Sequence, residues 1–474
     1  MTIDWENIFH ILYLLNIIIA LWIMVKVLLG NRNPFATISW VFVLLFIPLL
    51  GLILYFFFGR DTRRLRYIRK RFGTQIQERA QIACHSIAEK EIPLQYKGLA
   101  KYLENVSEAF PESADIELVP DTVIFMESLL KAIEEAKKHI HLQFYIIEDD
   151  ECGKMLLEAL AAKAREGVEV RVLYDSVGCW RCNPRSFDIV REAGGEVNSF
   201  LKVRFPFLSR KTNYRNHRKI VVIDGQLGFV GGCNIANRYL QGINDGCWRD
   251  TMLSVTGYGV YGLQSSFLID WFLVSGEVVG GRRYFPNPQC SGSKLVQIAP
   301  SNPVGQWRTI PSALVMALTS TRSYVYIQTP YLMPKDQVLT AMESASLSGV
   351  DVRLMIPLRS DSCLADYASR SYLERLMRSG VKVYMYSKGM LHAKSFVADD
   401  MLTIIGSANM DFRSFDYNFE VSAYTYDEEF AKICKAQFLS DAECCRLLSL
   451  REFHKRPFVE KIKESLARLF SPIL

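Results

Sequence analysis

The sequence predicts an α/β protein in which two similar α-β-α lobes, related by a pseudo-two-fold repeat, follow two N-terminal transmembrane helices. Three observations support this prediction: two long apolar runs near the N-terminus, an order of strand-like and helix-like segments that occurs twice, and one histidine-containing motif in each copy. Strands that alternate with helices are typical of a largely parallel sheet with helices packed on its faces.

The two apolar runs cover residues 8–29 and 37–58, which is 22 residues each. Each run is long enough to cross the hydrocarbon core of a bilayer as a helix. The segment between them contains glycine, asparagine and proline, which is typical of a turn. We therefore expect residues 1–59 to form a transmembrane helical hairpin.

Seven lysine and arginine side chains follow the second run between residues 60 and 71, whereas Asp4 and Glu6 precede the first run without any base. Positive charge marks the cytoplasmic side of a membrane protein, so we expect a multi-pass protein whose lobes face the cytoplasm. Residues 60–110 are predicted to be a basic juxtamembrane linker. The formal net charge of +6 fits an anionic partner, either lipid headgroups or nucleic acid.

The remainder of the chain repeats itself, and we place the first lobe at 111–274 and the second at 296–474. In each copy an extended segment is followed by a helical stretch and then by a strand-like segment that contains a glutamine, Gln143 in one and Gln328 in the other. The stretch 275–295 is rich in glycine, proline and serine, and it is predicted to link the lobes.

One motif occurs at corresponding places in the two copies with identical internal spacing. The first copy contains His217, Lys219, Asp224 and Asn234, and the second contains His392, Lys394, Asp399 and Asn409. A single His-x-Lys is most often a surface strand with two polar residues. The second copy, with the same spacing out to the asparagine, favours a functional site instead.

The spacing of the motif indicates a β-hairpin. Positions i and i+2 of a strand share a face, so His217 and Lys219 point the same way. Asp224 and the glycine after it form a hairpin-turn signal, and the returning strand brings Asn234 back to the level of His217. An imidazole, a cation and an amide then share one surface, which suits a tetrahedral anion. This geometry places Asp224 and its counterpart Asp399 in the turns, where a carboxylate caps the backbone rather than touching the ligand.

Two histidines can carry out phosphodiester exchange, one as nucleophile and the other as proton donor to the leaving oxygen. Lysine and asparagine would stabilise charge on the phosphoryl oxygens. Neither copy holds both histidines, so the site is predicted to form at the interface between the lobes. Asp250 and Glu420 follow the two motifs and are candidates to orient the imidazole rings through their second nitrogens.

Metal and nucleotide cofactors have no support in the sequence, because no zincin, Walker or dinucleotide-binding motif is present. His139 and His141 form a His-x-His pair without further ligands, and we expect no metal there. The 11 cysteines follow no disulfide framework and are interpreted as free thiols in a reducing compartment.

The paired motifs resemble the HKD motifs of the phospholipase D superfamily, and the N-terminal hairpin resembles that of bacterial cardiolipin synthases with two HKD motifs. The resemblance implies two phospholipase D-like lobes and a catalytic set, with Asn234 and Asn409 as phosphate-binding residues. That set comprises His217, Lys219, Asp224, His392, Lys394 and Asp399. It further implies transfer of a phosphatidyl group from one phosphatidylglycerol to another through a phosphohistidine, without metal, at the bacterial inner membrane. By analogy His217 attacks, and His392 acts as acid and then as base.

Other functions remain open at this point. A phospholipase D-type hydrolase would use the same site with water as acceptor, and a superfamily nuclease would use it on nucleic acid. The expected partners are phosphatidylglycerol, other anionic phospholipids and the membrane, with no nucleic acid and a possible homo-oligomer. The acceptor range, including phosphatidylethanolamine or other alcohols, is not set by the sequence.

Two further segments are candidates for membrane contact. Residues 203–211 combine an apolar tip with basic neighbours just before His217, and they could enter the headgroup layer or pack as an ordinary loop. After Pro457, apolar residues recur at helical spacing to the end of the chain, which predicts a helix. That helix could lie on the membrane surface or pack on the second lobe.

Overall fold

The computed structural model describes residues 5–30, 34–58, 91–202, 214–242, 246–289, 292–303, 305, 307–472 and 474. The N-terminal helices form one compact unit, and both predicted lobes belong to a second. Two predicted features lie outside the described residues: the basic run at 60–71 and the apolar loop at 203–211.

The N-terminal unit contains α1 (Trp5–Leu28), α2 (Pro34–Phe46) and α3 (Pro48–Phe58). Helix α1 packs against both others, and Ala20, Met24 and Leu44 are buried among them. Most other apolar side chains of these helices are exposed, which fits a lipid environment. The segment Ile8–Leu28 is long and apolar enough to cross a bilayer, as predicted for the first span.

The prediction of one continuous second span was wrong. Proline has no N–H and cannot donate to the carbonyl four residues earlier, so helix α2 ends before Pro48 and the chain bends at Ile47. A Cβ atom on Gly51 would lie 2.9 Å from the carbonyl oxygen of Val43, so the bend also requires glycine at this position. Within the described residues only α1 is long enough to span a membrane alone.

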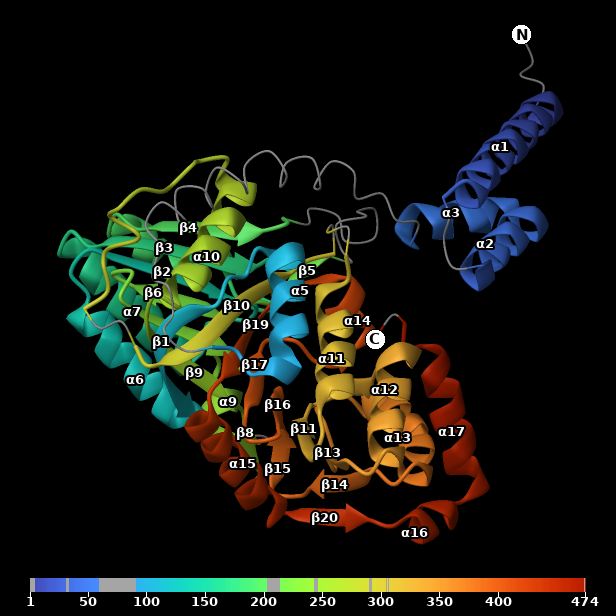
Figure 1. Cartoon of the computed structure of the whole chain (residues 1–474). Helices are drawn as coiled ribbons and strands as arrows, with labels where there is room; N and C mark the ends of the chain where they lie inside the picture. Colours follow the sequence, from blue (N-terminus) through green and yellow to red (C-terminus); the bar gives the residue numbers. More distant parts are fainter. Residues whose placement is uncertain are drawn as a thin grey trace. The chain divides into compact units, whose positions relative to one another are not determined.

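The second unit contains the two lobes and the helix before them, α5 (Lys97–Ser107) (Figure 1). The elements of the first lobe are β1 (Glu112–Val119), α6 (Thr122–Glu135), β2 (His139–Phe144), α7 (Glu151–Arg165), β3 (Glu169–Asp175), α8 (Asp188–Glu192), β4 (Glu196–Phe200), β5 (Arg215–Asn216), β6 (Ile220–Ile223), β7 (Leu227–Gly231), α9 (Asn237–Gln241), β8 (Cys247–Arg249), β9 (Met252–Gly257) and α10 (Val260–Ser275). Those of the second lobe are β10 (Lys294–Ser301), α11 (Thr309–Ser320), β11 (Tyr324–Gln328), β12 (Leu332–Met333), α12 (Asp336–Leu347), β13 (Asp351–Pro357), α13 (Cys363–Arg378), β14 (Lys382–Tyr386), β15 (Gly389–Leu391), β16 (Ser395–Ala398), β17 (Leu402–Gly406), β18 (Met410–Asp411), α14 (Phe412–Asp416), β19 (Asn418–Tyr426), α15 (Glu428–Ala442), β20 (Cys445–Leu448), α16 (Leu450–His454) and α17 (Phe458–Leu469).

One continuous sheet runs through both lobes in the order β20-β14-β13-β11-β16-β17-β19-β10-β1-β9-β7-β6-β2-β3-β4. Strands β1 and β10 pair antiparallel near its centre, with Ser113 opposite Leu295 (Figure 1). Outward from this pair, β9-β7-β6-β2-β3-β4 corresponds in order to β19-β17-β16-β11-β13-β14, and β20 is an additional edge strand of the second lobe. The outer strands of each lobe are parallel, β2 with β3 and β4, and β11 with β13 and β14. The two copies of the predicted internal repeat are therefore related by a pseudo-two-fold axis between β1 and β10.

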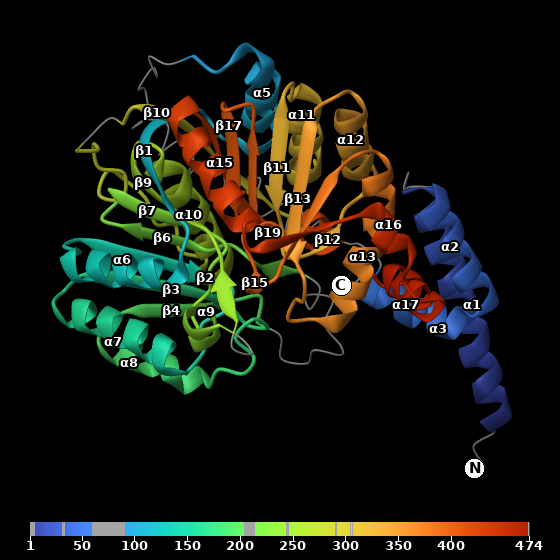
Figure 2. The same ribbon diagram turned by 90° about the horizontal axis from the view of Figure 1, so that it is seen from below.

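Strand β2 shows how the sheet of the first lobe is covered on both faces (Figure 2). Ile140, Leu142 and Phe144 belong to one apolar cluster with side chains of α6 and α7. On the opposite face the Nδ1 atom of His141 lies 2.7 Å from the amide nitrogen of Gln264 on α10. The predicted α-β-α layering follows from this alternation, because every position of β2 is buried.

The paired histidines of β2 belong to this core. The ring of His141 stacks on Phe267 at 4.6 Å and lies 4.8 Å from the ring of His139. Burial lowers the pKa of His139 to about 4 and that of His141 well below its ordinary value. Both rings therefore act as neutral aromatic packing groups on the α10 side of the sheet.

Helix α5 lies in the range predicted as a linker, and it packs on the second lobe rather than on the first lobe that it precedes. Leu99, Ala100 and Leu103 share an apolar cluster with Ala313 and Leu314 of α11. The segment before the first lobe thus covers the second.

The predicted C-terminal helix is confirmed as α17. Glu464 and Ala467 are buried where this helix packs against α13. One face of the helix therefore packs on the second lobe, which was one of the two predicted alternatives. Phe458, Leu466 and Leu469 remain exposed on the rest of its surface.

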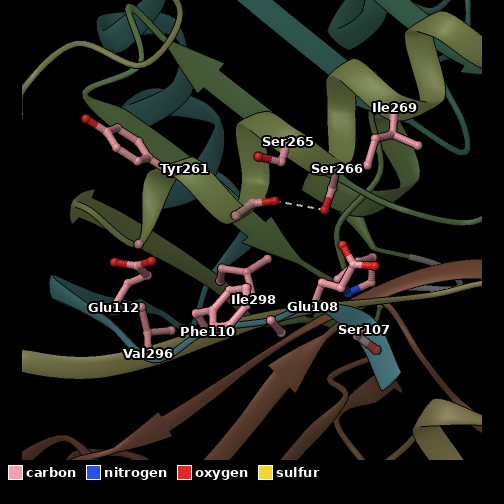
Figure 3. Close-up of a pocket in the computed structure, with 14 residues that line it drawn as sticks. Ser107, Glu108, Phe110, Glu112, Tyr261, Ser265, Ser266, Ile269, Val296 and Ile298 are labelled. Atoms are coloured by element: carbon pink, nitrogen blue, oxygen red, sulfur yellow. Dashed lines mark hydrogen bonds between the residues drawn. The ribbon is translucent and has the colours of Figure 1, made fainter. Parts of the chain in front are cut away.

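A small cavity of about 70 Å³ lies between α10, β10 and the segment that leads into β1 (Figure 3). Its lining includes Phe110, Glu112, Tyr261 and Val296. Glu112 is mostly buried, and burial raises the pKa of its carboxyl to about 7. The motif residues predicted from the sequence do not line this cavity.

Candidate functional site

Two short parallel pairings bring the motifs of the two lobes together. Strand β5 leads into His217 and pairs with the start of β19, where Phe419 lies opposite Asn216. Strand β15 leads into His392 and pairs with β8, where Leu391 lies opposite Arg249. In the first pairing the next residues are His217 and Glu420, and in the second they are His392 and Asp250. Each histidine therefore lies beside a carboxylate from the other lobe.

The imidazole–carboxylate contacts are short. The Nδ1 atom of His217 lies 3.0 Å from both carboxylate oxygens of Glu420. The Nδ1 atom of His392 lies 2.5 Å from Oδ2 of Asp250. The two carboxylate residues are fully buried, whereas the histidines are 8% and 6% exposed. Asp250 and Glu420 make these contacts at Nδ1, which leaves Nε2 of each ring for a ligand; their orienting role stays a prediction.

The motif lysines lie beneath the imidazoles. The Nζ atom of Lys219 donates to the backbone oxygen of His217 at 2.7 Å. The Nζ atom of Lys394 lies 2.8 Å from Nδ1 of His392 and also bonds the backbone oxygen of that residue. Both ammonium groups are buried, and burial lowers the pKa of each. The two amines therefore lie directly behind the imidazoles.

Burial also controls the protonation of the histidines. It lowers the pKa of His217 to about 4; Glu420 opposes this shift and the charge of Lys219 adds to it. For His392 burial and Lys394 lower the pKa to about 4, against Asp250. Both rings are therefore neutral at neutral pH in the empty site, which suits a nucleophile. A bound phosphodiester anion would raise the pKa of the ring that serves as the acid.

The carboxylates stay ionised in spite of their burial. Burial acts to raise the pKa of Asp250, but Lys394 and the contact with His392 outweigh it and hold the pKa below the ordinary value. The pKa of Glu420 is likewise held below its ordinary value, because its contacts with His217 and Lys219 outweigh burial. Two ionised carboxylates and two buried lysines therefore lie together beneath the histidines.

Asn234 and Asn409 line the cavity onto which the two histidines open, but both side chains already have protein partners. The amide nitrogen of Asn234 donates to the hydroxyl of Tyr239 at 2.7 Å, and its oxygen accepts from the backbone of Ile146 at 3.2 Å. The amide nitrogen of Asn409 lies 3.2 Å from the carboxylate of Asp411. Phosphate binding by the two asparagines, expected from the sequence, remains a prediction that requires an exchange of these contacts.

The motif aspartates lie in the turns between β6 and β7 and between β16 and β17, apart from the cavity. Asp224 accepts from the backbone nitrogens of three consecutive residues, Lys137, Lys138 and His139, at 2.7–2.9 Å. Asp399 repeats this with Arg322, Ser323 and Tyr324, and it also bonds Gln95 and Tyr96. Both have a φ of 54°. Their carboxylates bind the segment before the neighbouring strand, not the turn itself as the sequence suggested.

The one difference between the motifs, Gly232 against Ser407, is explained by the carboxylates. A Cβ atom on Gly232 would lie 2.0 Å from Oδ1 of Asp250, so only glycine leaves room for that side chain. Ser407 instead donates its hydroxyl to Glu420 at 2.5 Å. Each position therefore supports the carboxylate of its own lobe in a different way.

The two histidines open onto one cavity of about 270 Å³ that both lobes line. Aromatic rings flank them: Tyr145 lies 5.0 Å from His217, and Trp248 lies 5.1 Å from His392. The described lining residues are Tyr145, Ile146, His217, Asn234, Tyr239, Tyr331, Met333, Asp361, Ser362, Ala365, His392, Asn409, Asp411, Arg413, Asn418 and Leu474. The sequence analysis missed the tyrosines, Asp361 and Arg413. Only Arg413 carried a signal, because an arginine follows the motif asparagine by four residues in both copies.

Within the described ranges no three His, Cys, Asp or Glu side chains are grouped so that they could hold a metal ion. The arrangement itself provides two imidazoles, each with one nitrogen fixed by a carboxylate and the other facing a shared cavity. Such a pair can attack a phosphorus atom from one side and supply a proton on the other.

Comparison with known proteins assigns the family. The family described as "Cardiolipin synthase, PLD-like domain" matches residues 129–250 and 314–442, which include both motif histidines. The chain belongs to the cardiolipin synthase family. The family described as "Phospholipase_D-nuclease N-terminal" matches residues 14–60. The resemblance found in the sequence is therefore confirmed.

Relatives match over nearly the whole chain. The major cardiolipin synthase ClsA of Bacillus subtilis is 37% identical, with 98% of both chains covered. A cardiolipin synthase of Geobacillus kaustophilus is 39% identical and covers 99% of this chain and 95% of its own. Among solved structures, phosphatidylserine synthase from Haemophilus influenzae matches with a TM-score of 0.60 at 16% identity, covering 80% of this chain and 100% of its own. That likeness confirms the fold of the duplicated lobes.

Proposed function

We propose that this protein joins two phosphatidylglycerol molecules into cardiolipin and releases glycerol. The observation that carries the proposal is the pair of histidines at one cavity, each fixed through Nδ1 by a carboxylate of the other lobe. The cardiolipin synthases that align over nearly the full chain support the same reaction.

In the first step Nε2 of His217 attacks the phosphorus of the donor lipid. The new P–N bond forms as the P–O bond to the glycerol headgroup breaks, and His392 gives its proton to the departing glycerol oxygen. Glu420 keeps the attacking ring oriented and balances the positive charge that develops on it. The product of this step is a phosphatidyl group on His217 and a neutral His392.

In the second step a hydroxyl of the acceptor's glycerol headgroup attacks the same phosphorus. Its proton passes to His392, the P–N bond breaks, and the starting protonation states return. Lys219 and Lys394 stabilise the negative charge on the phosphoryl oxygens through their proximity to the rings. The aromatic walls limit water, which would otherwise take the phosphatidyl group.

A direct test uses purified full-length protein in mixed micelles of labelled phosphatidylglycerol. Formation of cardiolipin with one glycerol per molecule supports the proposal. Phosphatidic acid with glycerol would indicate a phospholipase D-type hydrolase instead. Cleavage of nucleic acid without action on lipid would indicate a nuclease. His217→Ala and His392→Ala serve as inactive references.

The role of each histidine needs its own experiment. Rapid quenching with phosphate-labelled lipid, followed by peptide mapping, should recover the label on His217. Label on His392 would reverse the two roles and leave the overall reaction unchanged.

We further propose that the lobes lie on the cytoplasmic side of a bacterial inner membrane and that the N-terminal region crosses it more than once. The basic residues at 60–71 support this orientation, and the apolar helix α1 supports membrane association. Protease treatment of sealed inverted vesicles should degrade the lobes, whereas protection of the lobes would contradict the orientation.

A further inference from the structure

The internal repeat contains one unequal pair of arginines. Arg238 follows Asn234 by four residues, and Arg413 follows Asn409 by four. The guanidinium of Arg238 bonds the carboxylate of Glu148 at 2.5 Å. Arg413 is partly buried and lines the catalytic cavity, and among the described residues no carboxylate lies within ion-pair distance of its side chain.

The sheet pairings explain why Arg413 lacks this partner. Ile147 bridges Ile235 in the first lobe, and Leu332 pairs with Met410 in the second. In each lobe the bridge joins two equivalent positions. One is the residue directly after the motif asparagine, and the other lies four residues after the shared glutamine, Gln143 or Gln328. The next residue along is Glu148 in the first copy and Met333 in the second. The second lobe therefore has a buried methionine where the first has the counter-ion.

Within the described lining of the cavity, Arg413 is the sole lysine or arginine. The acids that share this lining have other partners. Asp361 accepts from the hydroxyl of Tyr331, and Asp411 accepts from the backbone nitrogen of Ser414 and from Asn409. A guanidinium that has no counter-ion among the described residues, and that lines the proposed phosphodiester-binding cavity, is a site for a second anion.

We propose that Arg413 binds the phosphodiester of the acceptor lipid. This inference rests on the proposed function. The phosphatidyl group held on His217 brings one phosphate, and the acceptor brings another on the far side of the glycerol that attacks. The product carries both, so the cavity needs a second anion site in addition to the one between the histidines. Arg413 would hold the acceptor's phosphate and place its glycerol hydroxyl at the phosphohistidine.

Two reactions of the same full-length protein separate acceptor binding from chemistry. The first is cardiolipin formation from labelled phosphatidylglycerol. The second is exchange of unlabelled phosphatidylglycerol with labelled free glycerol, which passes through the same phosphohistidine but uses an acceptor without phosphate. Arg413→Gln should lower cardiolipin formation by about 10–100-fold, the usual effect of removing a charge-assisted contact. Glycerol exchange should fall much less, by no more than about three-fold. Arg413→Lys should recover part of the loss.

A second variant should block anion binding by Arg413 while the arginine itself stays in place. Met333→Glu would give Arg413 the counter-ion that Arg238 has, and it should lower cardiolipin formation more than glycerol exchange. Met333→Gln introduces a side chain of similar size without the charge and should lower cardiolipin formation less. Arg238→Gln removes the equivalent arginine outside the cavity and tests whether loss of any such arginine has the same effect.

The outcomes are distinct. Equal loss of both reactions in Arg413→Gln would show that the arginine serves the donor phosphate or the fold, and it would overturn the inference. Full cardiolipin formation in that variant would overturn it as well. If the unmodified protein performs exchange or hydrolysis but makes no cardiolipin, the proposed function fails, whatever the variants do.

Discussion

Glu420 of the second lobe fixes His217 of the first at 3.0 Å, and Asp250 of the first lobe fixes His392 of the second in the reverse direction. Neither lobe alone therefore contains a correctly supported histidine. The crossing depends on the parallel pairings β5–β19 and β8–β15, which place each carboxylate opposite the other lobe's histidine.

Removing either carboxylate should therefore lower turnover more than substrate affinity. We expect Glu420→Gln and Asp250→Asn each to lower kcat by about 100-fold or more, because the imidazole loses its orientation and its counter-charge. Glu429→Gln, a change at an exposed position of α15, is the matched control. A fall confined to KM would contradict this role.

The position of Gly232 can be tested through the chain's own repeat. Gly232→Ala should displace the Asp250 carboxylate, because the new Cβ would lie 2.0 Å from its Oδ1 atom. We expect a loss of kcat similar to that of Asp250→Asn. Ser407→Gly, at the equivalent position, removes one hydrogen bond to Glu420 without any clash, so its loss should be about 10-fold or less. If Gly232→Ala lowered kcat less than Ser407→Gly, this account would be refuted.

The pH profile of kcat/KM should reflect the buried histidines. Because burial holds the pKa of His217 and His392 at about 4, the free enzyme keeps a neutral nucleophile as the pH falls through 6. We expect the acid-side loss of kcat/KM only near pH 4, not near the ordinary histidine value of about 6.5. Circular dichroism at each pH separates this loss from unfolding. An acid limb near 6.5 would show that the carboxylates outweigh burial.

Glu112 should make the stability of the lobes depend on pH. Its pKa rises from the ordinary value of 4.5 to about 7 on folding, so the folded state binds a proton more tightly than the unfolded chain. Stability is therefore highest below pH 4.5 as far as this group is concerned, and it falls as the pH rises through 7. Glu112→Gln should stabilise the protein by about 1–2 kcal/mol at pH 8, with no difference at pH 4. Glu117→Gln, on an exposed position of the same strand, should leave the melting temperature unchanged at both pH values.

Several parts of the fold followed from sequence because they depend on local spacing. The order of strands and helices in each copy, the hairpin after His217 and the turn at Asp224 are set by residues close together in the chain. The same holds for the placement of both histidines at one interface, since neither copy has two. The break between α2 and α3 at Pro48 could also have been predicted from the proline itself, but the apolar residues on both sides of it favoured one continuous helix.

Other features could not be predicted because they depend on how the copies meet. The pairing of His217 with Glu420 rather than with Asp250 is a consequence of the pseudo-two-fold axis, which spacing along the chain does not determine. The packing of α5 on the second lobe likewise joins segments some 200 residues apart, such as Ser107 and Thr309. Arg413 was missed because its significance lies in Met333, which stands at the position where the first lobe has Glu148, the partner of Arg238.

The motif aspartates should act on stability more than on chemistry. Asp399 accepts hydrogen bonds from three backbone nitrogens and from Gln95 and Tyr96, so Asp399→Ala would leave these donors without an acceptor. We expect it to lower the free energy of unfolding by about 2–4 kcal/mol. Asp399→Asn should cost less, because asparagine keeps one acceptor oxygen and tolerates the left-handed backbone at φ 54°. Turnover per folded molecule, measured below the melting transition, should fall less than for Glu420→Gln. If Asp399→Asn lost turnover as severely while melting normally, the aspartate would have to act on the chemistry from the far end of its hairpin.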